Sequence, residues 1–146
     1  MSEKPITVPF FRPSLGDEEK KAVCAVIDSG WLTTGKITHA FEEEFAAFTG
    51  ARHALAVNSN TSGMILAMEA CGVKAGTAVI TTPYTFVSTA ASALHLGADV
   101  LFADVEPNSN SIDPRAVERL LAADREHKVR AIVPVHIAGN VCNMQA

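Results

Sequence analysis

A short polar stretch, Asn58-Ser59-Asn60-Thr61-Ser62-Gly63, contains the residue types that bind phosphate. It precedes an apolar run at residues 64–68, which predicts a helix beginning near Thr61. The first turn of a helix has unpaired N–H groups and a partial positive charge, and neighbouring hydroxyls add donors. The predicted first turn contains no Asp or Glu, so an external anion could occupy it beside the hydroxyls of Ser59, Thr61 and Ser62.

A simpler interpretation of this stretch remains open. Serine and threonine are preferred helix caps, and capping alone explains the loop about equally well. The stretch also lacks the GxxxxGK pattern of a P-loop and the GxGxxG pattern of a Rossmann turn.

Two other loops follow predicted strands, where parallel sheets collect ligands. In Thr82-Pro83-Tyr84-Thr85-Phe86, an aromatic side chain could stack on a flat cofactor ring, or it could pack on the next helix as a hydrophobic staple. His136 follows a third strand and could donate or accept a hydrogen bond, but it is a single histidine without a partner in the sequence pattern.

These loops are positioned by an alternation of short Val/Ile/Ala-rich strands and helices of about ten residues. The predicted strands cover residues 54–57, 78–81, 100–103 and 130–135, and helices cover 61–71, 86–96 and 114–122. Before them we expect a helix capped by Ser14, a polar loop at 31–36, and a helix that carries Phe41, Phe45 and Phe48 and ends at Gly50. The pattern predicts an α/β fold with a mostly parallel sheet and flanking helices.

Composition excludes several classes of protein. The 146 residues are 48% hydrophobic with a net charge of −4, which is atypical of a disordered chain. The basic residues are dispersed and no apolar run approaches the roughly 20 residues of a membrane span, so neither nucleic acid nor a membrane is an expected partner. The cysteines Cys24, Cys71 and Cys142 have no zinc-site spacing, and with no signal peptide apparent we expect a cytoplasmic protein.

Several motifs together resemble the DegT/DnrJ/EryC1/StrS family of sugar aminotransferases. They are Asp28–Lys36, Asn58–Ser62, Thr82–Thr89, Leu96-Gly97-Ala98, Ile112-Asp113-Pro114 and Pro134-Val135-His136. The resemblance runs from about Ile6 to the last residue in the family's order and spacing. It implies an aspartate aminotransferase-like fold (fold type I) that uses pyridoxal 5′-phosphate (PLP).

The resemblance also implies roles for particular residues. Backbone and hydroxyl groups at Asn60, Thr61 and Ser62 would hold the cofactor phosphate, and Phe86 would stack on the pyridine ring. Candidate substrate contacts are Thr33, Thr34 and Gly35. Residues 1–53 are expected to form an N-terminal helical segment with an active-site loop, and residues 54–146 the N-terminal part of an incomplete PLP-binding large domain.

The sequence departs from the family pattern at the phosphate loop and lacks two functional groups. Asn60 and Ser62-Gly63 stand where the family usually has Gly and Ala-Ala. The Asp that pairs with the pyridine nitrogen and the Lys that forms the Schiff base follow, in the family, the segment present here. None of the lysines matches that motif, so no catalytic residue is assigned and the chain alone is expected to be inactive. The lysines are Lys4, Lys20, Lys21, Lys36, Lys74 and Lys128.

The resemblance predicts transfer of an amino group, with glutamate as donor, to a nucleotide-linked ketosugar. The complete protein is expected to be a homodimer. Two other interpretations remain: a non-catalytic module that binds phosphate ligands, and a degenerate fragment of the family. The sequence predicts no metal site.

Overall fold

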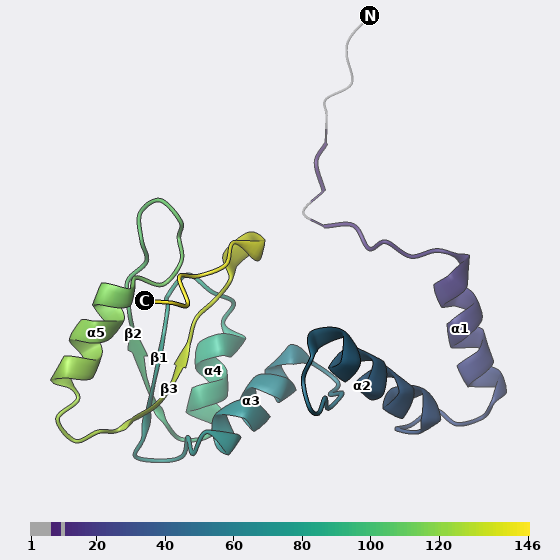
Figure 1. Cartoon of the computed structure of the whole chain (residues 1–146), viewed down its shortest axis with the longest axis horizontal. Helices are drawn as coiled ribbons and strands as arrows, with labels where there is room; N and C mark the ends of the chain where they lie inside the picture. The colour runs from purple at the N-terminus through teal and green to yellow at the C-terminus, as the bar shows by residue number, and fades with distance from the viewer. Residues whose placement is uncertain (1–6, 10) are drawn as a thin grey trace, which may run out of the picture. The chain divides into compact units, whose positions relative to one another are not determined.

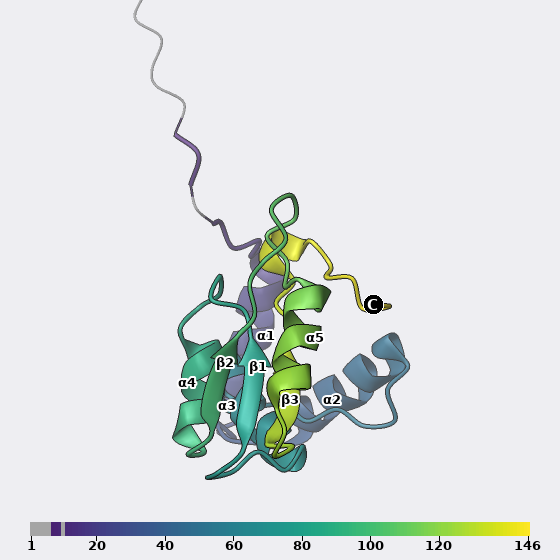
Figure 2. The same cartoon turned by 90° about the vertical axis from the view of Figure 1, so that its left-hand side faces the viewer.

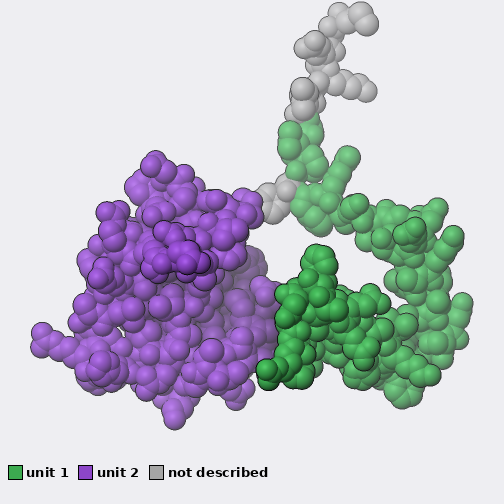
Figure 3. All heavy atoms as spheres, in the orientation of Figure 1, with its two compact units in different colours: residues 1–56 green, residues 57–146 purple. Residues whose placement is uncertain are grey.

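The computed structural model describes residues 7–9 and 11–146, so Lys4 and the start of the family resemblance at Ile6 lie outside the described residues. The chain divides into two compact units, Met1–Ala56 and Val57–Ala146, coloured separately in Figure 3.

The first unit contains helices α1 (Asp17–Asp28) and α2 (Lys36–Thr49), and neither helix has a buried residue. The predicted Ser14 cap of α1 is wrong, because the N-cap is Gly16. The Glu19 carboxylate reaches back 2.6 Å to accept from the Gly16 N–H, which starts the helix two residues later. Helix α2 ends at Gly50 as predicted, in the left-handed conformation with φ of 72°.

The second unit is an α/β layer structure (Figure 1). Helix α3 (Asn60–Ala70) leads into a parallel sheet built from β1 (Ala78–Thr81), β2 (Asp99–Phe102) and β3 (Val129–Val133). The intervening helices are α4 (Ser88–His95) and α5 (Pro114–Ala123), and a 3₁₀ turn, η1 (Ile137–Gly139), follows β3. The predicted α/β class and parallel sheet are therefore confirmed.

The strand order is β2-β1-β3, with every residue of β1 buried. The crossovers from β1 to β2 and from β2 to β3 run in opposite directions across the sheet, so a common right-handedness sends their helices to opposite faces. Figures 1 and 2 show α5 on one face and α3 and α4 on the other. Because side chains alternate along a strand, Ile80 packs in the α5 cluster and Val79 packs with α3 and α4.

One predicted strand is wrong. Residues 54–57 form no strand in the described structure, although the segment contains the expected apolar residues. A strand needs the backbone of a neighbour, and no described strand pairs with residues 54–57. The Ala56 N–H instead donates to the Glu42 carboxylate at 2.9 Å.

Candidate functional site

The first turn of α3 is organised by the polar residues before it. Ser59 is the N-cap, and its Oγ accepts from the Ser62 N–H at 3.1 Å, while the Gly63 N–H donates to the Ser59 carbonyl at 3.1 Å. The Ser62 hydroxyl donates to Asn58 Oδ1 at 2.7 Å. The capping interpretation is thus correct for Ser59, since its side chain satisfies a backbone donor of the helix.

Two backbone N–H donors and one hydroxyl donor stay unpaired at this helix end within the described residues. Among residues 7–9 and 11–146, the backbone N–H groups of Asn60 and Thr61 have no acceptor, and the Thr61 hydroxyl makes no hydrogen bond. Thr61 is half-buried, whereas Asn60 is exposed. The first turn of α3 contains no acidic residue, although the same is true of α2, α4 and α5. The Thr61 hydroxyl, which makes no hydrogen bond to a described residue and lies beside two unpaired N–H groups, is therefore more informative than the lack of acidic residues.

This donor set fits a phosphate group. Phosphate oxygens accept hydrogen bonds only, and the helix N-terminus supplies N–H donors together with partial positive charge. The Thr61 hydroxyl adds a side-chain donor from the same turn. No carboxylate of the first turn opposes a bound anion.

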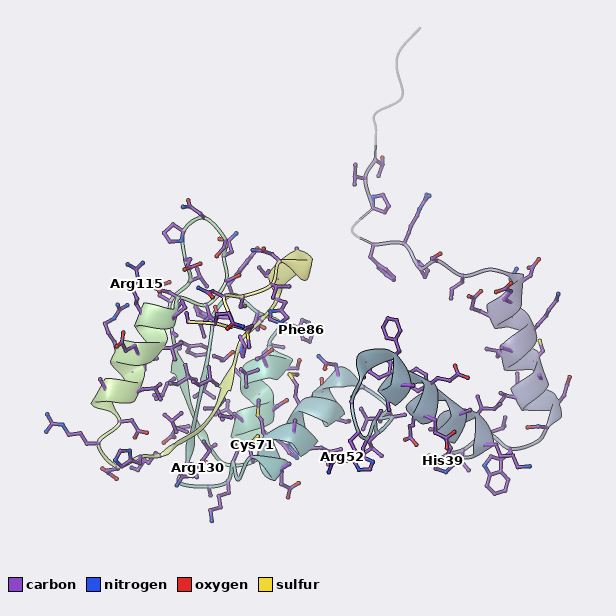
Figure 4. The ribbon with its side chains drawn as sticks, in the orientation of Figure 1. His39, Arg52, Cys71, Phe86, Arg115 and Arg130 are labelled. Carbon is purple, nitrogen blue, oxygen red and sulfur yellow. The ribbon has the colours of Figure 1, made fainter. Side chains whose placement is uncertain are left out.

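The second predicted loop follows the carboxyl end of β1 and leads into α4. Phe86 lies near the start of α4 (Figure 4), and its side chain is 76% exposed, while Tyr84 is 53% exposed. A hydrophobic staple would bury one of these rings against the helix, so the staple interpretation is wrong. The loop is held instead by the buried Thr82, whose Oγ1 accepts from the Tyr84 N–H at 3.2 Å. The Phe86 ring is free to contact a ligand.

The third predicted residue, His136, follows β3 and is exposed. Its Nδ1 accepts from the Cys142 N–H at 3.2 Å, and the Cys142 thiol lies 3.1 Å from the Val135 carbonyl. These contacts fold residues 135–142 back on themselves at the carboxyl end of the sheet. His136 thus has a partner that its sequence surroundings did not indicate, and the bond places its lone pair on Nδ1.

The candidate substrate residues Thr33, Thr34 and Gly35 lie together in the first unit, before α2. The Trp31 indole N–H donates to the Thr34 carbonyl at 3.0 Å. The indole also covers Gly35, because a Cβ built there would lie 2.6 Å from Trp31 Cδ1. Trp31 therefore shapes the backbone of this loop, although 61% of the residue stays exposed.

Glu42 fixes the end of the first unit. Its carboxylate accepts from the Ala56 N–H and lies 3.0 Å from His39 Nδ1. The backbone N–H of Ala56, followed by the contact with His39, lowers the pKa of Glu42. This ion therefore holds the segment that leads into Asn58.

Two lysines of the second unit lie at the amino ends of strands, away from the loops that follow β1 and β3. Lys74 precedes β1, and Lys128 precedes β3 and pairs with Glu126 at 2.9 Å. The hydrogen bond that Lys128 donates to the Glu126 carboxylate raises the pKa of Lys128. The described residues contain no group of three or more His, Cys, Asp or Glu arranged for a metal ion. Within the same residues, no helix is long and apolar enough to cross a membrane.

Residues 13–146 match the model of the DegT/DnrJ/EryC1/StrS aminotransferase family. The chain belongs to this family. Its members are PLP-dependent aminotransferases, so the predicted family, fold and cofactor class are confirmed. The Asn58–Ser62 loop, the Thr82–Phe86 loop and His136 all lie within the matched residues.

Comparison with individual members of the DegT/DnrJ/EryC1/StrS family shows what share of a relative's length this chain covers. It is 44% identical over 139 residues to the spore coat polysaccharide biosynthesis protein SpsC of Bacillus subtilis, covering 95% of this chain and 35% of SpsC. The chain thus spans about a third of that relative's length.

Solved structures of the family likewise match this chain over about a third of their own length. The PLP form of a putative sugar aminotransferase from Streptococcus pneumoniae, Spr1654, is 28% identical with a TM-score of 0.86, covering 94% of this chain and 34% of Spr1654. PseC of Helicobacter pylori, an aminotransferase involved in the biosynthesis of pseudoaminic acid, is 36% identical with a TM-score of 0.79, covering 91% of this chain and 35% of PseC.

Sequence reasoning missed Asn58 as the hydrogen-bond partner of Ser62. A usable signal was present, because Asn58 and Ser62 are two polar residues four positions apart at a helix start. Side chains of Asn at such positions commonly bond the first turn.

Proposed function

We propose that this sequence is the N-terminal part of an aminotransferase that moves an amino group from glutamate to a nucleotide-linked ketosugar. The observation that carries the proposal is a set of donors on Asn60 and Thr61, at the start of α3, that have no acceptor among the described residues, in a chain of a PLP-dependent family. The sugar chemistry is supported by relatives named for polysaccharide and pseudoaminic acid biosynthesis.

Within this proposal, the first turn of α3 holds the cofactor phosphate. The Asn60 and Thr61 N–H groups and the Thr61 hydroxyl supply the hydrogen bonds, and Ser62 lies in the same turn. The exposed Phe86 ring stacks on the pyridine ring and limits its tilt. When bound, PLP supplies the electron sink that transamination needs.

The substrate is assigned to the loop of the first unit. Thr33 and Thr34 offer hydroxyls, and Gly35 offers a backbone N–H. Trp31 keeps this loop in one conformation through its bond to Thr34. Hydroxyls and backbone donors suit a sugar, which presents many hydroxyls of its own.

We also propose a homodimer for the complete protein. The support is the apolar surface of the first unit, where α2 exposes Ile37, Phe41 and Phe45. Exposed apolar patches of this kind mark interaction surfaces.

The proposal also includes a cytoplasmic location. The three cysteines are free thiols, which fits that location.

The test uses the longest natural chain that carries this sequence. Purified protein is incubated with PLP, dialysed and analysed for retained cofactor, then given glutamate and a panel of nucleotide-linked ketosugars. The proposal predicts retained PLP, release of 2-oxoglutarate and an amino sugar detected by mass spectrometry. Retained PLP without amino transfer would favour the non-catalytic binding module, and no retained PLP would overturn the proposal.

The same assay on residues 1–146 alone tests the expected inactivity. No lysine of this sequence matches the Schiff-base motif of the family, so we propose that this segment transfers no amino group by itself. Release of 2-oxoglutarate by the segment would contradict that assignment.

A further inference from the structure

The two serines at the start of α3 are joined in one hydrogen-bonded chain. Ser62 Oγ lies 2.7 Å from Asn58 Oδ1 and 3.0 Å from Ser59 Oγ. Ser59 Oγ in turn lies 3.1 Å from the Ser62 backbone nitrogen. The hydroxyls of both serines therefore face groups of the protein itself.

Counting protons assigns a direction to each bond. An amide oxygen only accepts, so the single proton of the Ser62 hydroxyl goes to Asn58. The Ser62 hydroxyl proton is already used in that bond. In the contact between the two serines, the Ser59 hydroxyl must therefore be the donor and Ser62 Oγ the acceptor. Ser59 Oγ accepts the Ser62 N–H with a lone pair. Neither serine keeps a proton for an incoming anion.

Thr61 differs from its neighbours in this respect. Its hydroxyl makes no hydrogen bond among the described residues, so its proton is available without breaking an existing bond. An anion that recruits Ser62 must first replace the 2.7 Å bond to Asn58. Breaking a hydrogen bond to make another returns little net free energy, whereas a new bond to a charged group adds more.

We propose that Asn58 is a positioning residue that withholds the Ser62 hydroxyl from phosphate, so that Thr61 and the backbone N–H groups carry phosphate recognition. This inference rests on the proposed function, because it concerns the same cofactor phosphate. It involves one of the departures from the family pattern, since Ser62 stands where the family usually has Ala. The extra hydroxyl is absorbed by Asn58 and adds no ligand to the site.

The test compares the affinity for pyridoxal 5′-phosphate with that for pyridoxal in the longest natural chain that carries this sequence. Equilibrium dialysis gives the affinity for each compound. The affinity for pyridoxal 5′-phosphate divided by the affinity for pyridoxal is a ratio that measures the phosphate-dependent part of binding. The variants are Asn58→Ala, Ser62→Ala and the double variant, with Ser62→Cys as a second replacement if Ser62→Ala changes the thermal unfolding curve. Pyridoxal, which lacks phosphate, is the matched control ligand.

We expect Ser62→Ala to change the ratio by less than about twofold, because the lost hydroxyl was already bonded. Asn58→Ala releases that hydroxyl and should raise the ratio about threefold, a gain that the double variant removes. A roughly tenfold fall in Ser62→Ala, the size expected for a lost bond to a charged group, would overturn the inference. An unchanged ratio in Asn58→Ala would overturn it as well.

Failure of the proposed function gives a different result. In that case the parent chain binds pyridoxal 5′-phosphate no more tightly than pyridoxal, and the inference falls with it. A parent chain with a clear phosphate preference but a strong Ser62→Ala defect refutes only the role of Asn58.

Discussion

The Thr81 hydroxyl donates a hydrogen bond of 2.9 Å to the carbonyl of Val133, which lies 52 residues further along the chain. Thr81 ends β1 and is fully buried, and Val133 ends β3. The bond therefore ties together the carboxyl ends of two parallel strands. The loops that contain Phe86 and His136 leave the sheet just beyond it.

Replacing this hydroxyl should destabilise the sheet. Thr81→Val keeps the shape of the side chain and removes the bond, so we expect a loss of about 1 kcal/mol in the free energy of unfolding. The comparison is Ser111→Ala, because the buried Ser111 hydroxyl has no partner in the described part of the chain. That change should be neutral or stabilising, as measured by urea unfolding. Equal losses in the two variants would contradict the role of the Thr81 bond.

The start of β3 should be sensitive to acid. The Asp124 carboxylate accepts from the N–H groups of Val129 and Lys128, both at 2.9 Å, and these bonds lower its pKa below the ordinary 3.8. A carboxyl with a lowered folded-state pKa stabilises the fold above the unfolded-state pKa, and the contribution disappears as the pH falls through the folded-state pKa.

Asp124→Asn should therefore reduce stability at neutral pH and flatten its dependence on pH below about 4. The measurement is the free energy of unfolding between pH 7 and pH 2.5. Asp28→Asn is the control, because no described residue donates a hydrogen bond to that exposed carboxylate. An Asp124→Asn curve parallel to that of the parent chain would rule out the proposed linkage.

The loop at Gly35 should not accept a side chain. A Cβ there would lie 2.6 Å from Trp31 Cδ1, so Gly35→Ala must displace the indole and lengthen its bond to the Thr34 carbonyl. We expect the Trp31 indole N–H signal to move in the NMR spectrum and to exchange with solvent faster, by about tenfold for one lost hydrogen bond. Gly16→Ala is a matched control at the N-cap of α1, where the added Cβ would meet only Glu19 Oε2 at 3.5 Å. An unchanged indole signal in Gly35→Ala would argue against this packing.

Local pattern was sufficient to predict much of the fold. The strand at 78–81 is predicted at its observed bounds because a short Val/Ile/Ala-rich run lies between turn residues. The Gly50 terminus of α2 was predictable because only a residue tolerant of positive φ ends a helix in that way. Residues 54–57 have the composition of a strand, but strand formation depends on a partner that local sequence cannot reveal.

The candidate site was predictable in residue type but not in hydrogen bonding. The polar stretch before α3 indicates an anion site or a set of caps, and the structure gives its residues different roles. Ser59 caps the helix, Ser62 donates a hydrogen bond to Asn58, and the Thr61 hydroxyl has no partner among the described residues. The partner of His136 could not be predicted, since Cys142 reaches it only through the fold of the residues between them. Such choices depend on side-chain directions set by backbone geometry.

The phosphate preference of Thr61→Val, in the longest natural chain that carries this sequence, tests most directly whether the start of α3 binds the cofactor phosphate. We expect this variant to lose about tenfold in affinity for pyridoxal 5′-phosphate, because one donor to a charged group is removed, while its affinity for pyridoxal stays unchanged. An unchanged affinity for pyridoxal 5′-phosphate in Thr61→Val would contradict the assignment of the phosphate to the start of α3.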